Sequence, residues 1–495
     1  MILAGADGKA RQPVNKPEAG KHEWGLDLGM WLYSFLLTVT LVLGAPYWLF
    51  RMATSGRYRA GLRRRLGIIP AELRAQVAAM RVERRGGGGL RPLMWIHAVS
   101  VGEVLAAARL VEEFKTGIFQ RERPGTVFAV STTTKAGQRL ALERLPGCAV
   151  FYFPLDFAFA VRRYLKMLGP EMVVLVESEL WPRLITECAK ARIPVAVVNA
   201  RVSDRSFPKY MALRPLWRPL LAKVALFLAQ SEEAAERLRE MGAPTIEVTG
   251  NLKYDAHPGK ETALVLALRM KMQGDALPIV CGSTLAGEET MLLDAWPAIV
   301  EAEPRALLVL APRHPDRFDQ VALLIKERGL TALRGTTFLR TKAAVKPGGI
   351  LLLDTIGDLG SLYGLAAVAF VGGSLVAEGG HNPLEPAQLG IPVLIGPSFE
   401  NFREIVEAMQ ANDGIRIVQP AELGDRLLRL LQDRDEAEAL GARGRAVSAA
   451  QAGASARTAS ALLKLLPAPV QSRNDSNPRA RTPVESVDKE AGAAQ

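Results

Sequence analysis

The chain has 495 residues, too many for a single hydrophobic core, and this length predicts two or three domains. Hydrophobic residues make up 49% and charged residues 23%, a globular composition that excludes a wholly disordered chain. The net charge of +11 favours anionic partners, but an aromatic content of 6% without an interleaved basic and aromatic strand argues against nucleic acid. The three scattered cysteines argue against a disulfide framework or a cysteine-based zinc site.

The most apolar segment lies near the start of the chain. Residues 28–50 carry no charge and are long enough to cross about 30 Å of hydrocarbon. Arginines are frequent between residues 51 and 65, so the positive-inside rule places the following domains in the cytoplasm. We expect a retained single-pass anchor, because a cleaved signal peptide has a shorter apolar core and a small-residue cleavage site. A helix that lies in the membrane interface and is broken at Pro46 is the alternative.

Three segments flank the expected domains. Residues 1–27 form an N-terminal extension, and residues 51–90 form a basic connector. The connector includes the glycines 86–89, which we interpret as a flexible linker because no Lys-Ser/Thr pair follows as in a phosphate loop. Residues 467–495 lack apolar periodicity, and we expect a disordered tail there.

From Pro92 to the 460s, short apolar runs alternate with helical stretches. We expect strands at residues 94–101, 126–132, 172–178, 194–200, 226–230, 246–250, 278–284, 306–313, 350–354, 368–373 and 392–396. This pattern predicts parallel sheets that are covered by helices on both faces. The number of runs is large for one open sheet, and residues 252–277 form a joint in the middle of the chain. We therefore expect an α/β protein with two doubly wound domains, at residues 91–255 and 256–466, and a cleft between them. A (β/α)₈ barrel is the alternative, which the joint disfavours.

Candidate catalytic carboxylates follow two of the predicted strands, at the edge where α/β sheets bind ligands. Glu103 lies in the first turn of a predicted helix, where the helix dipole stabilises a carboxylate by ~0.3–1 kcal/mol. It is either an ordinary first-turn residue or a general base that takes a proton from an acceptor hydroxyl. Glu177 and Glu179 share a face if their strand continues that far. Because no His or Asp completes a ligand set, hydroxyl binding is favoured over a metal site there.

Other predicted strands end in basic or glycine-rich segments. Lys253 lies at the joint, where it is either a cation that faces an anion or a solvated linker residue. Arg313 suits phosphate or carboxylate recognition at the end of its strand. A glycine-rich segment precedes Asn382-Pro383, where we expect a helix start with amides that bind phosphate and with Glu385 one turn further. No GxGxxG follows the first strand, which argues against a dinucleotide dehydrogenase.

Taken in order, several segments resemble the Kdo transferases, membrane-associated enzymes that move 3-deoxy-D-manno-oct-2-ulosonic acid (Kdo) from CMP-Kdo to the lipid A precursor in Gram-negative bacteria. The segments are HAVSVGE (97–103), STTTKAGQ (131–138), ESELWPRLI (177–185), NARVSDRS (199–206), QSEEAAERL (230–238), VTGNLKYD (248–255), APRHPDRF (311–318), DTIGDLGSLYGLA (354–366) and FVGGSLVAEGGHNPLEPAQLGIPVLIGP (370–397). The resemblance covers the chain from about Leu28 to the 460s. It implies a GT-B glycosyltransferase with two Rossmann-like domains, an N-terminal anchor helix, and no metal or other cofactor.

The resemblance also implies roles for individual residues. Glu103 corresponds to the proton acceptor of the family, and Glu177 and Lys253 correspond to residues assigned to transition-state stabilisation. The positions that correspond to CMP-binding residues are Pro312, Arg313, Ile356, Gly357, Asp358, Asn382, Pro383, Leu384 and Glu385. The family usually has Glu where this chain has Asp358, which is one methylene shorter.

The function implied by the resemblance is an inverting transfer of Kdo from CMP-Kdo to lipid IVA, in lipopolysaccharide core biosynthesis at the cytoplasmic side of the inner membrane. The implied partners are CMP-Kdo, the lipid A precursor and inner-membrane lipids. The donor is anionic, and Lys253 and Arg313 can offset its charge. Two other functions stay open: a GT-B enzyme that uses another nucleotide sugar on a lipid-linked acceptor, and a non-catalytic, membrane-anchored protein that binds a nucleotide or a lipid.

Overall fold

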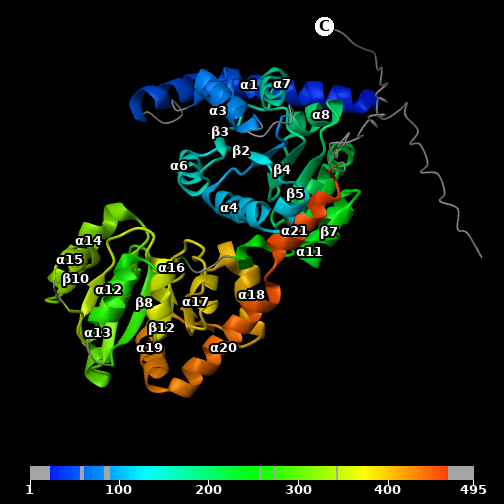
Figure 1. Cartoon of the computed structure of the whole chain (residues 1–495). Coiled ribbons are helices and arrows are strands. Elements are labelled where there is room, and N and C mark those ends of the chain that lie inside the picture. Colours follow the sequence, from blue (N-terminus) through cyan, green and yellow to red (C-terminus); the bar gives the residue numbers. More distant parts are fainter. Residues whose placement is uncertain are drawn as a thin grey trace, which may run out of the picture.

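The computed structural model describes residues 23–55, 61–82, 90–255, 259, 261–272, 275–341 and 344–466. The expected extension up to residue 22, the glycines 86–89 and the expected tail from residue 467 lie outside these ranges. Within them, the chain forms two domains, each built on its own sheet and joined next to residue 255 (Figure 1).

The N-terminal domain contains a parallel sheet that, in the described residues, has seven strands in the order β3-β2-β1-β4-β5-β6-β7. The strands are β1 (Leu93–His97), β2 (Val127–Thr132), β3 (Ala149–Tyr152), β4 (Met172–Val176), β5 (Val195–Ala200), β6 (Leu226–Ala229) and β7 (Ile246–Val248). Alternate residues pack on opposite faces: Trp95 and Val173 lie in one core cluster, and Ile96 and Val174 in the other. Burial on both faces explains why the central strands are continuous apolar runs.

The C-terminal domain repeats this plan. Its described strands form a seven-stranded parallel sheet in the order β10-β11-β9-β8-β12-β13-β14. The strands are β8 (Leu277–Thr284), β9 (Ala306–Pro312), β10 (Ala332–Arg334), β11 (Ile350–Leu352), β12 (Val368–Val371), β13 (Val393–Ile395) and β14 (Arg416–Ile417). The two sheets confirm the expected pair of doubly wound α/β domains and show that the barrel alternative is wrong.

Helices cover both faces of each sheet. In the N-terminal domain they are α2 (Leu62–Arg65), α3 (Ala71–Arg81), α4 (Val101–Thr116), α5 (Ile118–Glu122), α6 (Lys135–Arg144), α7 (Ala158–Leu168), α8 (Pro182–Lys190), α9 (Phe207–Ala212), α10 (Arg214–Leu221) and α11 (Glu232–Met241). In the C-terminal domain they are α12 (Ala263–Lys271), α13 (Glu288–Ala302), α14 (Phe318–Glu327), α15 (Gly335–Arg340), α16 (Leu359–Leu362), α17 (Leu384–Ala387), α18 (Arg403–Ala411), α19 (Leu423–Gln432) and α20 (Arg434–Gln451). Short 3₁₀ turns, including η1 (Leu252–Asp255) at the domain junction, complete the described elements.

The last described helix, α21 (Ala454–Leu463), returns to the N-terminal domain. It packs against α4 and α5, and Leu462 lies in the core of that domain (Figure 1). The Asp255 carboxylate accepts a hydrogen bond from the Gly453 amide at 2.6 Å, and Gly453 takes the left-handed φ of +86° that the turn requires. The range 256–466 that we expected for the C-terminal domain therefore ends too late, because the chain crosses back near Gly453.

The apolar segment near the start is the helix α1 (Glu23–Ser55), which is longer than the expected residues 28–50. Residues 29–48 of this helix are long and apolar enough to cross a membrane. Pro46 lies inside the helix, so the break at Pro46 that was part of the interfacial alternative does not occur. Figure 1 shows α1 running lengthwise across the N-terminal domain.

Candidate active site

Glu103 lies at the switch point of the N-terminal sheet. β1 has β2 on one side and β4 on the other, and doubly wound sheets bind ligands where the strand order reverses in this way. Glu103 is in the first turn of α4, and Ser100 is the N-cap of that helix. The Glu103 carboxylate accepts hydrogen bonds from the Val99 amide at 2.7 Å and from the Ser100 hydroxyl at 2.8 Å. These contacts fix the carboxylate next to the end of β1.

The surroundings of Glu103 favour the protonated form of its carboxyl group more than solvent water would. Burial raises the pKa of Glu103 to about 7, and the nearby charges of Glu177 and Glu179 add to this increase. The hydrogen bonds from Val99 and Ser100 act in the opposite direction. A carboxyl group with a pKa near 7 suits general base catalysis at neutral pH. Glu103 thus has the contacts of an ordinary first-turn residue and the acidity of a candidate base.

Glu177 directly follows β4, the neighbour of β1. Its φ of +60° lies in the left-handed region, a costly conformation for a glutamate and one that is enriched at functional sites. The Glu177 carboxylate pairs with the Arg201 guanidinium at 3.2 Å. Burial, and then the charge of Glu177, raise the pKa of Glu179. Because the strand ends at Val176, the shared face that we expected for the two glutamates as strand residues does not form.

Lys253 joins these carboxylates from the turn η1 at the domain junction. Its ammonium donates to the Asn401 carbonyl oxygen at 3.4 Å and lies 4.7 Å from the centre of the Phe402 ring, both in the C-terminal domain. Burial lowers the pKa of Lys253, while the charge of Glu177 acts in the opposite direction. Lys253 is therefore a partly buried cation between the domains rather than a solvated linker residue.

A second polar contact joins the domains beside Lys253. The Gln230 amide nitrogen donates to both carboxylate oxygens of Glu404 at 2.8 Å. The charge of Glu404 also favours the protonated form of Lys253. Glu404 was missed in the sequence, because an acidic residue in the first turn of a helix such as α18 is common and gives no sign of an interdomain contact.

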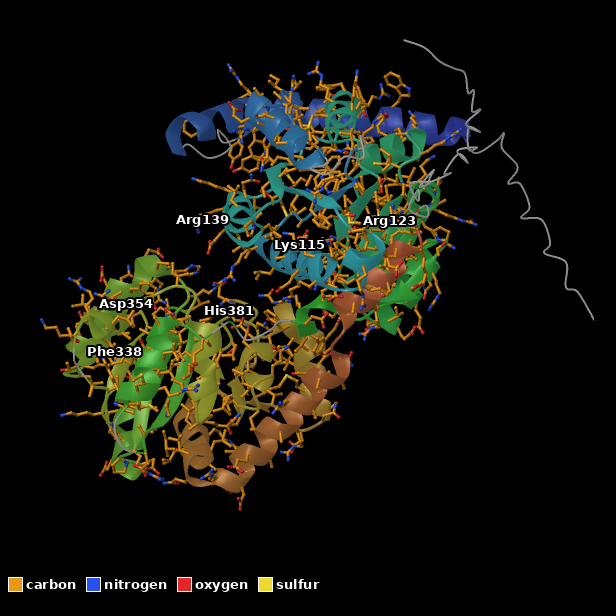
Figure 2. All side chains as sticks on the ribbon, in the orientation of Figure 1. Lys115, Arg123, Arg139, Phe338, Asp354 and His381 are labelled. Atoms are coloured by element: carbon orange, nitrogen blue, oxygen red, sulfur yellow. The ribbon has the colours of Figure 1, made fainter. Side chains whose placement is uncertain are left out.

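Basic side chains gather in the C-terminal domain near the end of β9. Pro312 is the last residue of β9, and the amide of the following Arg313 donates to the Thr284 carbonyl at 3.0 Å. Burial, and then the positive charges of Arg313 and His314, lower the pKa of His381 to about 4. Figure 2 shows His381 on the side of the C-terminal domain that faces the N-terminal domain. Arg313 and His381 thus lie close enough to sense each other's charge.

The segment Ile356-Gly357-Asp358 follows β11, the sheet neighbour of β9. Ile356 is 77% exposed, and Gly357 has a left-handed φ of +95°. Asp358 is the N-cap of α16 and accepts a hydrogen bond from the Thr355 hydroxyl. The structure therefore places this segment and Arg313 at the ends of adjacent strands.

The segment Asn382 to Glu385 leads into the short helix α17, with Pro383 as its N-cap and Leu384 fully buried. The Leu384 amide donates to the Asn382 side-chain oxygen at 3.2 Å, so this amide already has a partner within the chain. Burial raises the pKa of Glu385, and the charges of Arg109 and Arg313 oppose that increase. Arg109 belongs to α4, so Glu385 lies within electrostatic reach of both domains.

Two buried glutamates at the start of α13 were missed in the sequence. Glu289 pairs with the Arg317 guanidinium at 2.7 Å and accepts the Thr284 hydroxyl at 2.8 Å. Glu288 accepts four backbone amides at 2.7–3.0 Å, those of Leu285, Gly373, Ser374 and Leu375. Three of these amides, those of Gly373, Ser374 and Leu375, belong to the first glycine-rich turn, which therefore binds an internal carboxylate.

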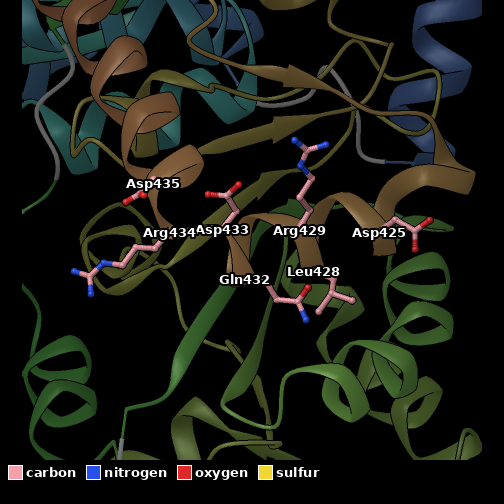
Figure 3. A pocket seen from close by; sticks show the side chains of 7 residues that line it. All are labelled: Asp425, Leu428, Arg429, Gln432, Asp433, Arg434 and Asp435. Atoms are coloured by element: carbon pink, nitrogen blue, oxygen red, sulfur yellow. The ribbon is translucent and has the colours of Figure 1, made fainter.

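A hollow of about 650 Å³ lies elsewhere, where α19 meets α20 (Figure 3). Three of its charged side chains have partners: Arg429 pairs with Glu436 at 2.7 Å, Arg434 pairs with Glu438 at 2.7 Å, and Asp433 caps α20. The lining residues are Asp425, Leu428, Arg429, Gln432, Asp433, Arg434 and Asp435. None of them is a sequence-predicted site residue, so the hollow is separate from the candidate active site.

Comparison with known proteins identifies the family. Residues 60–256 match the family model for 3-deoxy-D-manno-octulosonic-acid transferase. The chain is 34% identical over 355 residues to the 3-deoxy-D-manno-octulosonic acid transferase of Haemophilus influenzae. The aligned region covers 70% of this chain and 81% of the relative. It is 35% identical over 402 residues to the enzyme of the same name from Bordetella pertussis. This aligned region covers 78% of this chain and 91% of the relative.

A solved structure, the C-terminal CMP-Kdo binding domain of WaaA from Acinetobacter baumannii, is 28% identical to this chain. It covers 37% of this chain and 95% of that domain, with a TM-score of 0.35. The relatives from Haemophilus influenzae and Bordetella pertussis are both above 30% identity and are matched over most of their length, and they decide the assignment. The chain therefore belongs to the Kdo transferase family and is a glycosyltransferase.

Proposed function

We propose that the protein transfers Kdo from CMP-Kdo to lipid IVA, with inversion at the anomeric carbon and with Glu103 as the general base. The acceptor hydroxyl oxygen bonds to the anomeric carbon, the bond from this carbon to the phosphate oxygen breaks, and CMP leaves with the electron pair. The hydroxyl proton passes to the Glu103 carboxylate. The observation that carries the proposal is a fixed, buried carboxylate with a pKa of about 7 at the sheet's switch point, in a member of the Kdo transferase family.

Glu177 and Lys253 stabilise the transition state in this proposal. Each senses the other's charge, and Glu177 also acts on Glu103, so the three groups form one electrostatic unit. A lysine ammonium offsets the negative charge that develops on the leaving phosphate. The Glu177 carboxylate is suited to face the partial positive charge that develops at the anomeric centre. This division of roles requires no metal ion.

The donor nucleotide binds to the C-terminal domain in this proposal. Arg313 and the segment Ile356 to Asp358 lie at the ends of adjacent strands, and Glu385 is suited to accept hydrogen bonds from ribose hydroxyls. Asn382, Pro383 and Leu384 contribute the turn that positions Glu385. Because Leu384 is fully buried, it acts through its backbone.

The proposed location is the cytoplasmic side of the inner membrane, where the lipid acceptor resides. The apolar helix α1 and the net charge of +11 support attachment to an anionic membrane. Tethering an enzyme to the surface that holds its acceptor raises the effective concentration of that acceptor.

A nucleotide screen tests the donor and the role of Arg313. We expect CMP to raise the melting temperature of the protein more than UDP or GDP does, because a binder of the native state stabilises it. Replacing Arg313 with alanine should reduce this CMP effect and raise the KM for CMP-Kdo about 10- to 100-fold, with a smaller change in kcat. Arg434→Ala, an exposed arginine paired with Glu438 on α20, is the control that should change neither value. A preference for UDP would favour another GT-B enzyme, and an unchanged KM would remove Arg313 from the donor site.

A further inference from the structure

The first third of α1 is clamped to the N-terminal domain by polar contacts. The Tyr33 hydroxyl donates to the Asp156 carboxylate at 3.0 Å. The Arg183 guanidinium donates to the Ser34 hydroxyl at 2.9 Å and to the Met30 carbonyl at 2.7 Å. Asp156 is buried and also accepts the Arg183 and Leu184 amides at the start of α8. These bonds hold α1 to α8 at a defined register.

The clamped side continues as a stripe along the whole apolar helix. Six of the less exposed positions recur at intervals of three and four residues, which places them on one face: Met30, Ser34, Leu37, Leu41, Gly44 and Trp48. Tyr33 and Ala45 flank this row, and Val39 is a less exposed position outside it. The opposite face carries large apolar side chains that are each more than half exposed: Trp31, Leu32, Phe35, Leu36, Val42, Leu43, Tyr47 and Phe50. A helix that crosses lipid alone has no reason to hide one face, whereas a helix that lies on a protein does.

The path of the chain places both ends of α1 next to the N-terminal domain, and therefore on the same side of a bilayer. The N-terminal third contacts Asp156 and Arg183, and the residues after α1 enter the same domain, where Leu73 and Val77 of α3 lie in the core. The Leu155 amide donates to the Arg65 carbonyl at 2.7 Å, so the chain after α1 returns beside the clamp. Crossing a bilayer would require α1 to undock or would draw Asp156 and Arg183 into hydrocarbon, which is costly for charged groups.

A basic and apolar segment lies next to α1. α1 contacts α10, which belongs to a stretch, residues 205–230, without a single Asp or Glu. Leu213 and Leu216 of this stretch are at least half exposed. Its exposed cations are Arg205, Lys209, Arg214 and Arg218. Apolar side chains beside exposed cations match the interface of a bilayer with anionic headgroups.

We propose that α1 lies in the plane of the membrane interface, with its exposed apolar face in the lipid and its other face on the N-terminal domain, instead of crossing the bilayer. The occupant of this face is an anionic lipid surface, and α10 provides a second contact with it. The clamp lies at the edge of the sheet where β3 and β4 end, the edge that also carries Glu103 and Glu177. This arrangement brings the edge of the sheet that carries Glu103 and Glu177 towards the lipid surface. Its biological meaning, but not the evidence for it, rests on the proposed lipid acceptor.

A count of labels per molecule tests the arrangement. The double variant Gly29→Cys/Leu62→Cys places one thiol near the start of α1 and the other after its end, at the first residue of α2. A side chain at Gly29 meets open space, and Leu62 is exposed. The full-length protein is reconstituted into phosphatidylethanolamine–phosphatidylglycerol vesicles and treated from outside with a membrane-impermeant maleimide. We expect each molecule to carry two labels or none. A population with one label per molecule would overturn the proposal, and the wild type corrects for Cys148, Cys188 and Cys281, which are buried.

Vesicle binding of surface variants tests the lipid face. Phe35→Lys/Leu43→Lys should lower the fraction of protein that sediments with vesicles at least threefold. Leu323→Lys, at a similarly exposed apolar position on α14, is the matched control that should bind as the wild type does. Equal binding of all three proteins would contradict the proposal, and a melting temperature equal to that of the wild type shows that each variant is folded. Neither assay measures sugar transfer. A result that contradicts the interfacial position of α1 is therefore distinguishable from a result that contradicts the proposed function.

Discussion

Replacing Glu103 with glutamine is expected to lower the kcat for transfer by ~10²–10⁴-fold, the usual contribution of one general base. The amide keeps the size of the side chain and accepts the Val99 amide, but it cannot take a proton from the acceptor hydroxyl. The KM for CMP-Kdo should stay near its wild-type value, because Glu103 lies in the N-terminal domain, away from the proposed donor site. Initial rates at saturating donor and acceptor measure both quantities.

A matched control separates catalysis from helix capping. Glu422, like Glu103, lies three residues after an N-cap, and it forms a capping box with Gln419 in the C-terminal domain. Glu422→Gln should leave kcat unchanged, because glutamine serves a capping box as glutamate does. Transfer by Glu103→Gln within about threefold of the wild type would contradict the role of Glu103 as base.

The pKa of Glu103 also predicts opposite pH trends for activity and stability. Its pKa is raised from 4.5 to about 7, so the active carboxylate forms only as the pH rises through 7, and the rate should fall below that value. The raised pKa means that the folded state prefers the protonated form. The stability that this preference contributes is full below pH 4.5 and is lost as the pH rises through about 7, by roughly 3 kcal/mol at most. Above pH 7, Glu103→Gln should therefore melt no lower than the wild type.

Replacing Lys253 with methionine is expected to lower kcat by ~10²–10³-fold, the range for removing one preorganised electrostatic group. Methionine keeps an unbranched chain next to the Phe402 ring but removes the charge that faces Glu177. Single-turnover rates with bound CMP-Kdo report this loss directly, without a contribution from product release.

Lys464→Met is the control for this substitution. Lys464 forms an exposed ion pair with Glu247 at 3.4 Å on the N-terminal domain, and surface pairs of this kind contribute little to stability. Its kcat should equal that of the wild type. An unchanged single-turnover rate for Lys253→Met would show that Lys253 contributes only to the contact between the domains.

The central strands of both sheets were predictable from the sequence, whereas three edge strands were not. β1, β4, β8 and β12 are buried on both faces and therefore read as apolar runs. The missed strands, β3, β10 and β14, are short and lie at sheet edges, so their sequences carry a weaker signal. The return of α21 was also missed, because its packing against α4 depends on small residues that give no boundary signal.

Glu103 and Glu177 were predictable because each follows a central strand, and Lys253 because it lies at the joint between the domains, but the environment of these residues was not predictable. The spacing of Ser100 and Glu103 indicates a helix start, yet the pKa of Glu103 depends on burial and on Glu177 and Glu179, which only the fold brings near. Glu288 shows the reverse case. An acidic residue after a strand suggests solvent or ligand contact, but this one is fully buried among backbone amides and organises a loop distant in sequence.

The central claim, that the protein moves Kdo from CMP-Kdo to a lipid A precursor, is tested most directly by mass spectrometry of the reaction product. The detergent-solubilised full-length protein is incubated with Kdo, a CMP-Kdo-generating system and tetra-acylated lipid IVA. The account predicts lipid that gains one or more whole Kdo residues, with release of one CMP per residue, and loss of this product with Glu103→Gln. Unmodified lipid after incubation with protein that still binds CMP would contradict the account.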